Sequence, residues 1–120
     1  MTGAGCASEL TFSWGGNPGG GSLHRLRDAV ENQWPAPLKI HEHSHAGMAA
    51  AYAAGAANLP FGVLRGYAGT DLPGHTASAG WVDCPFTGER LAAVRALRPD
   101  PAYLHAPQAA RAGTLERVGI

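Results

Sequence analysis

The sequence predicts an α/β protein, a parallel-sheet sandwich with covering helices, and three observations lead to this class. Short apolar segments of strand length alternate with helical segments, a pattern typical of parallel sheets covered by helices. Polar and glycine-rich loops follow the predicted strands, where open sheets bind their ligands. The composition, 45% hydrophobic and 15% charged over 120 residues, suits a chain that buries a core and forms one domain or part of one.

The first predicted unit is a strand, a glycine-rich loop and a helix. Residues 10–14 form a short apolar run that favours a buried strand. Five of the seven residues at 15–21 are glycine. Ser22 is a suitable helix N-cap, and helical spacing continues through residue 33 with Leu23, Leu26 and Val30 as an apolar stripe. The WPAP stretch at 34–37 ends this helix, because a residue before proline disfavours helical backbone.

The second unit repeats this order with a strand at 38–40 and a helix from Ser44 through about residue 57. Ser44 is the expected N-cap, and the alanine-rich segment after it has high helix propensity. We expect Asn58 and Pro60 to end the helix, since Asn tolerates left-handed backbone and proline cannot continue a helix.

The remaining elements continue the alternation less clearly. They are a third strand at 61–65, a long loop at 66–80, a fourth strand at 81–86, a weak helix at 89–97, a last strand at 102–105 and a tail of little pattern at 107–120. Long loops in compact domains are usually functional or disordered, so the loop at 66–80 is a further candidate for function.

The glycine-rich loop is the first candidate site. A loop that enters a helix N-terminus offers free backbone N–H groups and a favourable dipole, which suit a phosphate or a carboxylate. Gly15, Gly16 and Asn17 are therefore candidate binding residues. The loop is neither a Walker loop nor a GxGxxG motif, and a tight turn that needs positive φ explains its glycines equally well.

The densest polar cluster is the segment HEHSH at residues 41–45. It matches the HExxH motif of zinc proteases, but that motif needs both histidines on one established helix, and the predicted helix begins only near Ser44. Three alternatives remain: adventitious metal binding by the three histidines on one face of a strand, a polar loop whose histidines bond to nearby carbonyls, and a substrate pocket with general acid or base help.

Several functional classes are excluded or disfavoured. A formal net charge of zero and a single lysine do not fit a nucleic-acid binder. No apolar run is long enough to span a membrane, and the N-terminus lacks the pattern of a secretory signal. Cys6 and Cys84 are far apart and lack CxxC spacing, so we expect two free thiols in the cytoplasm. The lone acids Asp71 and Glu89 are expected to be turn or cap residues.

A series of motifs resembles the A (alpha) subunit of class I coenzyme A transferases, and glutaconate-type A subunits in particular. The motifs lie in family order over roughly residues 10–105. They are SWGGNP at 13–18, GSLHRLRDA at 21–29, EHSHAGM at 42–48, LPF at 59–61, RGYAGTDLP at 65–73, CPFTGE at 84–89 and ALRPD at 96–100. Several linked motifs in order are more specific than any one alone.

The resemblance implies a CoA-transferase-like α/β fold and a heteromer of A-type and B-type subunits. Its reaction is ping-pong: a glutamate carried by the B-type half attacks an acyl-CoA, becomes an enzyme–CoA thioester and passes the CoA to a carboxylic acid. No such glutamate motif occurs in this chain, so the resemblance implies that the chain itself supplies no catalytic residue. Coenzyme A is a substrate, and no cofactor, metal, nucleic acid or membrane partner is implied.

The A-type half would instead shape the pocket for the acid and the thioester. The substrate-binding residues then expected are Gly15, Gly16 and Asn17 on one wall and His43, Ser44, His45 and Gly47 opposite. This juxtaposition requires both loops to leave strand ends on the same edge of the sheet. A CoA-ester hydrolase of the same fold and a non-catalytic remnant are the alternative functions.

The chain is shorter than family A subunits, so residues 1–120 are expected to be a partial, incomplete domain truncated at both ends. Around residues 105–114 the sequence also departs from the family pattern. An open sheet edge and bare apolar faces favour association. We therefore expect the isolated chain to aggregate or self-associate and to be inactive alone. We expect size-exclusion chromatography with a B-type subunit to detect a complex.

We predict that the histidine cluster at residues 41–45 binds no structural or catalytic zinc, because the helix and the third ligand that such a site needs are not predicted. Metal analysis of the purified chain after dialysis against a chelator should find far less than one zinc per chain. Stoichiometric zinc that survives the dialysis would contradict this prediction.

Overall fold

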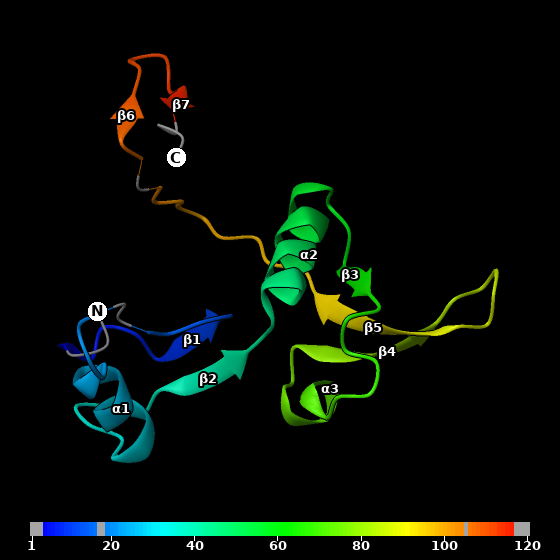
Figure 1. The fold of residues 1–120 in the computed structure, drawn as a ribbon, viewed down its shortest axis with the longest axis horizontal. Coiled ribbons are helices and arrows are strands. Elements are labelled where there is room, and N and C mark those ends of the chain that lie inside the picture. Colours follow the sequence, from blue (N-terminus) through cyan, green and yellow to red (C-terminus); the bar gives the residue numbers. More distant parts are fainter. Residues whose placement is uncertain (1–3, 17–18, 105, 117–120) are drawn as a thin grey trace.

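The computed structural model describes residues 4–16, 19–104 and 106–116. Its elements are β1 (Glu9–Phe12), α1 (His24–Glu31), β2 (Lys39–Glu42), α2 (His45–Ala56), β3 (Phe61–Leu64), α3 (Leu72–His75), β4 (Ala79–Asp83), β5 (Arg90–Arg95), β6 (Gln108–Ala109) and β7 (Leu115–Glu116). Short strands and helices alternate from β1 to β4, and only strands follow in the described chain (Figure 1).

The first two strands form a parallel pair with α1 as the crossover, as the sequence predicts. They pair in register from Glu9 opposite Lys39 to Phe12 opposite Glu42. Because side chains alternate along a strand, the pair has two different faces. The apolar face lies toward α1, where Leu26 and Phe12 approach Gly15. Because the strands are parallel and in register, both end at the same edge of the pair.

The second sheet is antiparallel, in the order β3-β5-β4, so an all-parallel sandwich is not confirmed. The helix predicted at 89–97 is wrong, because the apolar run there forms β5. Short apolar runs do not distinguish strand from helix by periodicity alone. The tight turn before it, closed by a bond from the Gly88 N–H to the Cys84 carbonyl, turns the chain into a hairpin with β4.

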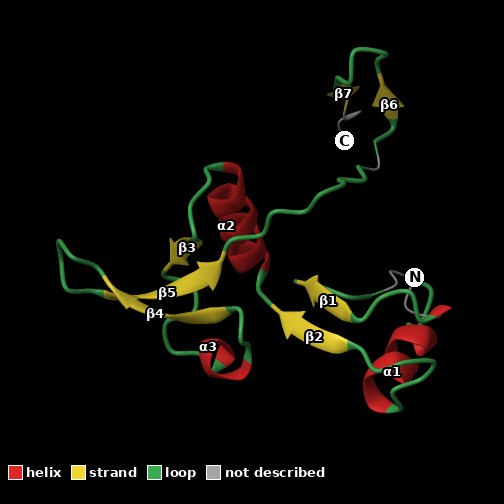
Figure 2. Cartoon of the chain, turned by 180° about the vertical axis from the view of Figure 1, so that it is seen from behind, coloured by secondary structure: helices red, strands yellow, loops and turns green. Residues whose placement is uncertain are grey.

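Helix α2 packs on the antiparallel sheet and forms the core with it (Figure 2). Ala51 of α2, Tyr67, Ala92 and Val94 are the fully buried members of this core. The approach is close because a Cβ atom on Gly55 would overlap with the carbonyl of Leu97. Small residues on α2 thus allow the helix backbone to lie against the strand ends.

The predicted ends are correct for α2, and for α1 the predicted N-cap is wrong while the helix does end before the WPAP stretch. The Ser44 hydroxyl accepts a bond from the Gly47 N–H at 3.0 Å, and Asn58 takes left-handed backbone with φ 57° after the helix. In contrast, the N-cap of α1 is Leu23, and no side chain caps it, so Ser22 does not have the predicted role.

The C-terminal part differs from the prediction as well. The strand predicted at 102–105 is absent over its described part, residues 102–104, and His105 lies outside the described residues. Beyond it, β6 and β7 form a small hairpin at the end of an extended segment (Figure 1). The loop predicted at 66–80 contains α3, which contacts β4.

The described chain is open rather than compact. Its radius of gyration is 17.1 Å, whereas a compact domain of this length has about 13–14 Å. Large apolar side chains are correspondingly exposed, among them Trp14, Phe86 and Tyr103 at 60%, 93% and 91%. None of the helices within the described ranges has the length and apolar character that a membrane crossing requires.

We predict that Gly55→Ala lowers the free energy of unfolding by about 1–3 kcal/mol, because the new methyl group would meet the Leu97 carbonyl at the α2–sheet contact. Urea denaturation followed by circular dichroism measures this change. Gly74→Ala in α3 is the matched helical control, since nothing lies within 4 Å of a Cβ there. Equal stability of the two variants would contradict the packing argument.

Candidate functional site

The predicted site lies where the parallel pair ends. The His43 N–H donates to the Phe12 carbonyl at 2.9 Å, so the pairing of β1 with β2 continues to the last residue of β1. The glycine-rich loop then leaves β1, and His43 and Ser44 leave β2, at the same edge. The two loops thus begin at one edge of the strand pair, as the sequence predicts. Asn17 lies outside the described residues.

The two described glycines among the candidate binding residues, Gly15 and Gly16, make room for aromatic rings. A Cβ atom on Gly15 would lie 3.3 Å from the Phe12 ring, and one on Gly16 would overlap with the Trp14 indole. Neither position has positive φ, so close packing and not left-handed backbone accounts for glycine here. Gly19 and Gly21, further along, do have positive φ.

His43 is the centre of a buried hydrogen-bond network. The residue is only 3% exposed. Nδ1 lies 3.2 Å from the Tyr67 hydroxyl, and Nε2 lies 2.7 Å from Ser78 Oγ. The Tyr67 hydroxyl also accepts a bond from the Ser44 N–H at 3.1 Å. The network therefore connects the end of β2 with the segments on either side of α3.

The buried Tyr67 hydroxyl decides how the protons are arranged in this network. It accepts the Ser44 N–H, so its own hydrogen needs an acceptor, and His43 Nδ1 is the acceptor at hand. Nε2 must then carry the ring hydrogen and donate it to Ser78 Oγ. This arrangement leaves the Ser78 hydroxyl hydrogen available to another acceptor, and it does not make His43 a base for Ser78.

Burial lowers the pKa of His43 below its usual value of 6.5, and the nearby His41 lowers it further. Both effects have the expected sign, because a low-dielectric environment and a like charge disfavour imidazolium. His43 is therefore neutral at neutral pH, as the hydrogen-bond arrangement requires.

The other predicted residues of this loop have structural partners. Ser44 caps α2, and a side chain on the buried Gly47 would overlap with the Tyr67 hydroxyl, so glycine is needed at that position. His45 is the first residue of α2 and is exposed. The two histidines of the predicted wall thus lie in different environments: His43 is buried and His45 is exposed to solvent.

His41 lies on β2 and not on a helix, so the geometry of an HExxH site is absent. Its Nε2 is hydrogen-bonded to the Glu9 carboxylate, which also pairs with Lys39 at 3.5 Å. The His41 bond and the Lys39 charge lower the pKa of Glu9. Within residues 4–16, 19–104 and 106–116, no group of three His, Cys, Asp or Glu side chains is placed to hold a metal ion.

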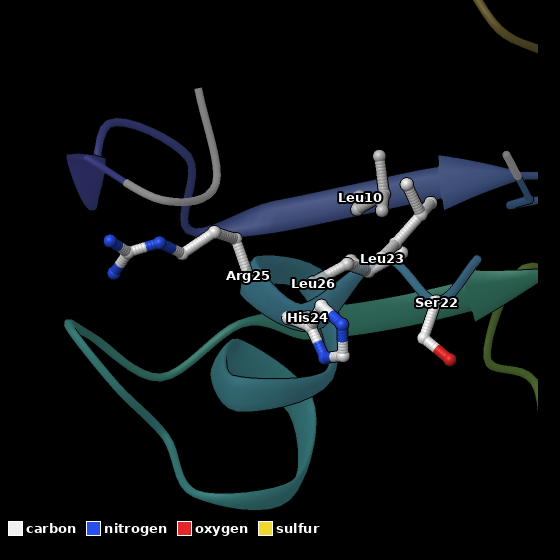
Figure 3. A pocket seen from close by; sticks show the side chains of 6 residues that line it. All are labelled: Leu10, Ser22, Leu23, His24, Arg25 and Leu26. Carbon is white, nitrogen blue, oxygen red and sulfur yellow. The ribbon is translucent and has the colours of Figure 1, made fainter. Parts of the chain in front are cut away.

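Two hollows lie beside the parallel pair. An apolar groove of about 550 Å³ runs between β1 and the start of α1, lined among others by Leu10, Leu23 and Leu26 (Figure 3). A smaller polar cavity of about 290 Å³ lies on the opposite face of the strands and includes His43, Ser78 and Arg95. Sequence reasoning missed Ser78 and Arg95, since nothing in their spacing relates them to the histidine cluster.

The chain is similar to a CoA-transferase subunit along its whole length. It is 60% identical over all its 120 residues to the A subunit of 3-oxoadipate CoA-transferase from Pseudomonas knackmussii. The resemblance to a coenzyme A transferase A-type chain is confirmed. The chain spans 43% of the length of that relative. No protein-family model matches the sequence.

A solved structure shares the fold seen here. The crystal structure of a variant of the decarboxylase AibA/AibB superposes with a TM-score of 0.76 and is 28% identical, over 96% of this chain and 44% of that one. The mixed α/β architecture is therefore that of a known structure. Similarity to a CoA-transferase subunit in sequence thus accompanies similarity to a decarboxylase in fold.

We predict that acidification destabilises the protein through His43. The unfolded chain takes up a proton at His43 near pH 6.5, and the folded chain does so only at lower pH. Stability that is present above about pH 6.5 should therefore be lost as the pH falls toward the folded pKa. Urea denaturation between about pH 5 and 8 measures this loss.

An NMR titration of the His43 ring is the direct check, and its pKa should lie below 6.5. The His43→Gln variant should lose the stability change in this pH window. A His43 pKa at or above its usual value would contradict the assignment of a buried neutral imidazole.

Proposed function

We propose that this chain acts as the A-type subunit, or part of the A-type subunit, of a CoA transferase. It would help to move CoA between an acyl-CoA and a carboxylic acid, with the nucleophilic glutamate on a partner B-type subunit. The observation that carries the proposal is the 60% identity, over the whole chain, to a CoA-transferase A-type chain. A metabolic enzyme of this kind would work in the cytoplasm.

The acid is proposed from the name of the relative. 3-Oxoadipate, named in that relative, is a dicarboxylate, and so is the glutaconate suggested by the sequence motifs. An acceptor acid with a second carboxylate therefore fits both resemblances better than a simple fatty acid. Coenzyme A enters as a substrate and not as a resident cofactor.

The pocket is proposed at the common end of β1 and β2. Backbone donors of Gly15, Gly16 and Asn17 would form one wall, and the segment from His43 to Gly47, with Ser44 and His45, would form the other. The in-register strand pair supports this proposal, because it directs both loops to one edge. The buried network around His43 would keep the second wall rigid.

A partner subunit would cover surface that this chain leaves open. The radius of gyration of 17.1 Å and the exposed Trp14 and Phe86 support association, since isolated soluble domains seldom leave such side chains bare together. We propose that the partner is a B-type subunit, because a glutamate nucleophile must be supplied from outside this sequence.

The decarboxylase neighbour supports a second candidate reaction. Its TM-score of 0.76 means that this backbone arrangement also occurs in an enzyme named for loss of carbon dioxide. Hydrolysis of a CoA ester and a non-catalytic remnant complete the alternatives. Each predicts a different product from the same mixture.

We predict that this chain, mixed with the B-type subunit of the related transferase, moves CoA from a labelled acyl-CoA to added 3-oxoadipate. The expected product is 3-oxoadipyl-CoA, measured by mass spectrometry, with no activity from this chain alone. Size-exclusion chromatography of the same mixture serves as the control for complex formation.

The other outcomes separate the alternatives. Free CoA released without an acceptor acid indicates hydrolysis, and carbon dioxide released from the acid indicates decarboxylation. A folded complex that forms none of these products overturns the transferase proposal and supports a remnant.

A further inference from the structure

A polar cavity lies on the face of β1 and β2 opposite α1, and His43 of the candidate site is part of its lining. Its volume is about 290 Å³, at the small end of ligand pockets and too small for a whole coenzyme A. Alternate residues of the two strands, Glu9 and Lys39 among them, form one side. Ser78, which precedes β4, and Arg95 of β5 form the other.

The charges in this cavity do not cancel. Glu9 is occupied by Lys39 at 3.5 Å and by His41, so the one carboxylate of the lining is already paired. Arg95 makes no ion pair or side-chain hydrogen bond with any residue that the structure describes. Arg95 therefore contributes to the lining a guanidinium charge that no carboxylate of the described residues pairs with.

Ser78 and Arg95 face the cavity together. The Arg95 N–H donates to the Ser78 carbonyl at 2.8 Å, which continues the β4–β5 ladder by one pair beyond Ala79 opposite Val94. Residues directly opposite one another in a ladder project their side chains to the same face. Ser78 and Arg95 thus project from neighbouring backbone segments toward the same wall.

The hydroxyl can donate to a ligand because of the network behind it. His43 Nε2 donates to Ser78 Oγ at 2.7 Å, so the oxygen accepts from the protein and its hydrogen is left for an acceptor. Thr76 Oγ1 at 2.8 Å is the acceptor within the protein, and a bound anion would compete with it as the stronger one.

We propose that this cavity binds the carboxylate of a small organic acid, held by the Arg95 guanidinium and the Ser78 hydroxyl. A planar carboxylate matches the guanidinium fork, and the hydroxyl supplies a third donor. If the acid is the one that accepts CoA, the carboxylate bound here is the one that does not react; this identification rests on the proposed function. The binding of a carboxylate in the cavity does not rest on it.

Adipate is a suitable probe, since it is a small dicarboxylate that lacks the reactive oxo group. Its affinity for the full chain, alone and in the complex with the B-type subunit, is measured by isothermal titration calorimetry. Arg95→Gln and Ser78→Ala should each weaken binding about tenfold or more, because each removes a donor to a charged ligand. Arg111→Gln, an exposed site with the same loss of charge, should leave binding unchanged.

Adipamide, the neutral analogue, should not bind if the carboxylate is what the site recognises. In the transfer assay, Arg95→Gln should raise the KM for the acid and leave the KM for acyl-CoA unchanged. Circular dichroism melts confirm that each variant is folded, and Arg95→Gln, whose side chain makes no bond within the described part of the chain, still tests the site if Ser78→Ala does not fold.

The outcomes separate this site from the proposed function. Adipate binding that Arg95→Gln weakens, without any CoA transfer, supports the site and counts against the transferase. Transfer with an acid KM that Arg95→Gln leaves unchanged overturns the site and leaves the transferase standing. Absence of adipate binding to both the chain and the complex also overturns the site.

Discussion

The connection between the parallel strand pair and the antiparallel sheet depends on the hydrogen bonds of His43. The imidazole follows β2, yet its two nitrogens bond to Tyr67 and Ser78, which precede and follow α3. It therefore ties the parallel pair to the antiparallel sheet through two hydrogen bonds. The buried imidazole makes both of these hydrogen bonds only in its neutral form. Protonation of this one ring would therefore weaken the connection between the two sheets.

Local signals in the sequence account for what could be predicted. The crossover from β1 to β2 and the Ser44 cap follow from spacing, turn chemistry and propensity, which act over a few residues. The β5 strand was missed because its alternation is faint, and its identity comes from pairing with two partners. The neighbourhood of His43, Ser78 and Arg95 arises from long-range pairing, which no local pattern records.

Some features of the candidate site could likewise be predicted from the sequence, and others could not. That the glycine-rich loop and the histidine loop share an edge could be deduced from parallel strand order alone. That Gly47 makes room for the Tyr67 hydroxyl could not, because the need for glycine there comes from a side chain in a different, distant loop. Motif resemblance located the region, and side-chain contacts supply the reason for the residues in it.

The in-register pairing of β1 with β2 has a consequence for how this region can change in evolution. Its two faces differ completely: Glu9 and His41 belong to the polar side, and Leu10 belongs to the apolar side. A single-residue insertion or deletion within either strand would exchange these sides beyond it and place charge against α1. Length changes should therefore be confined to the connecting loops, where an added residue leaves the register of the strands intact.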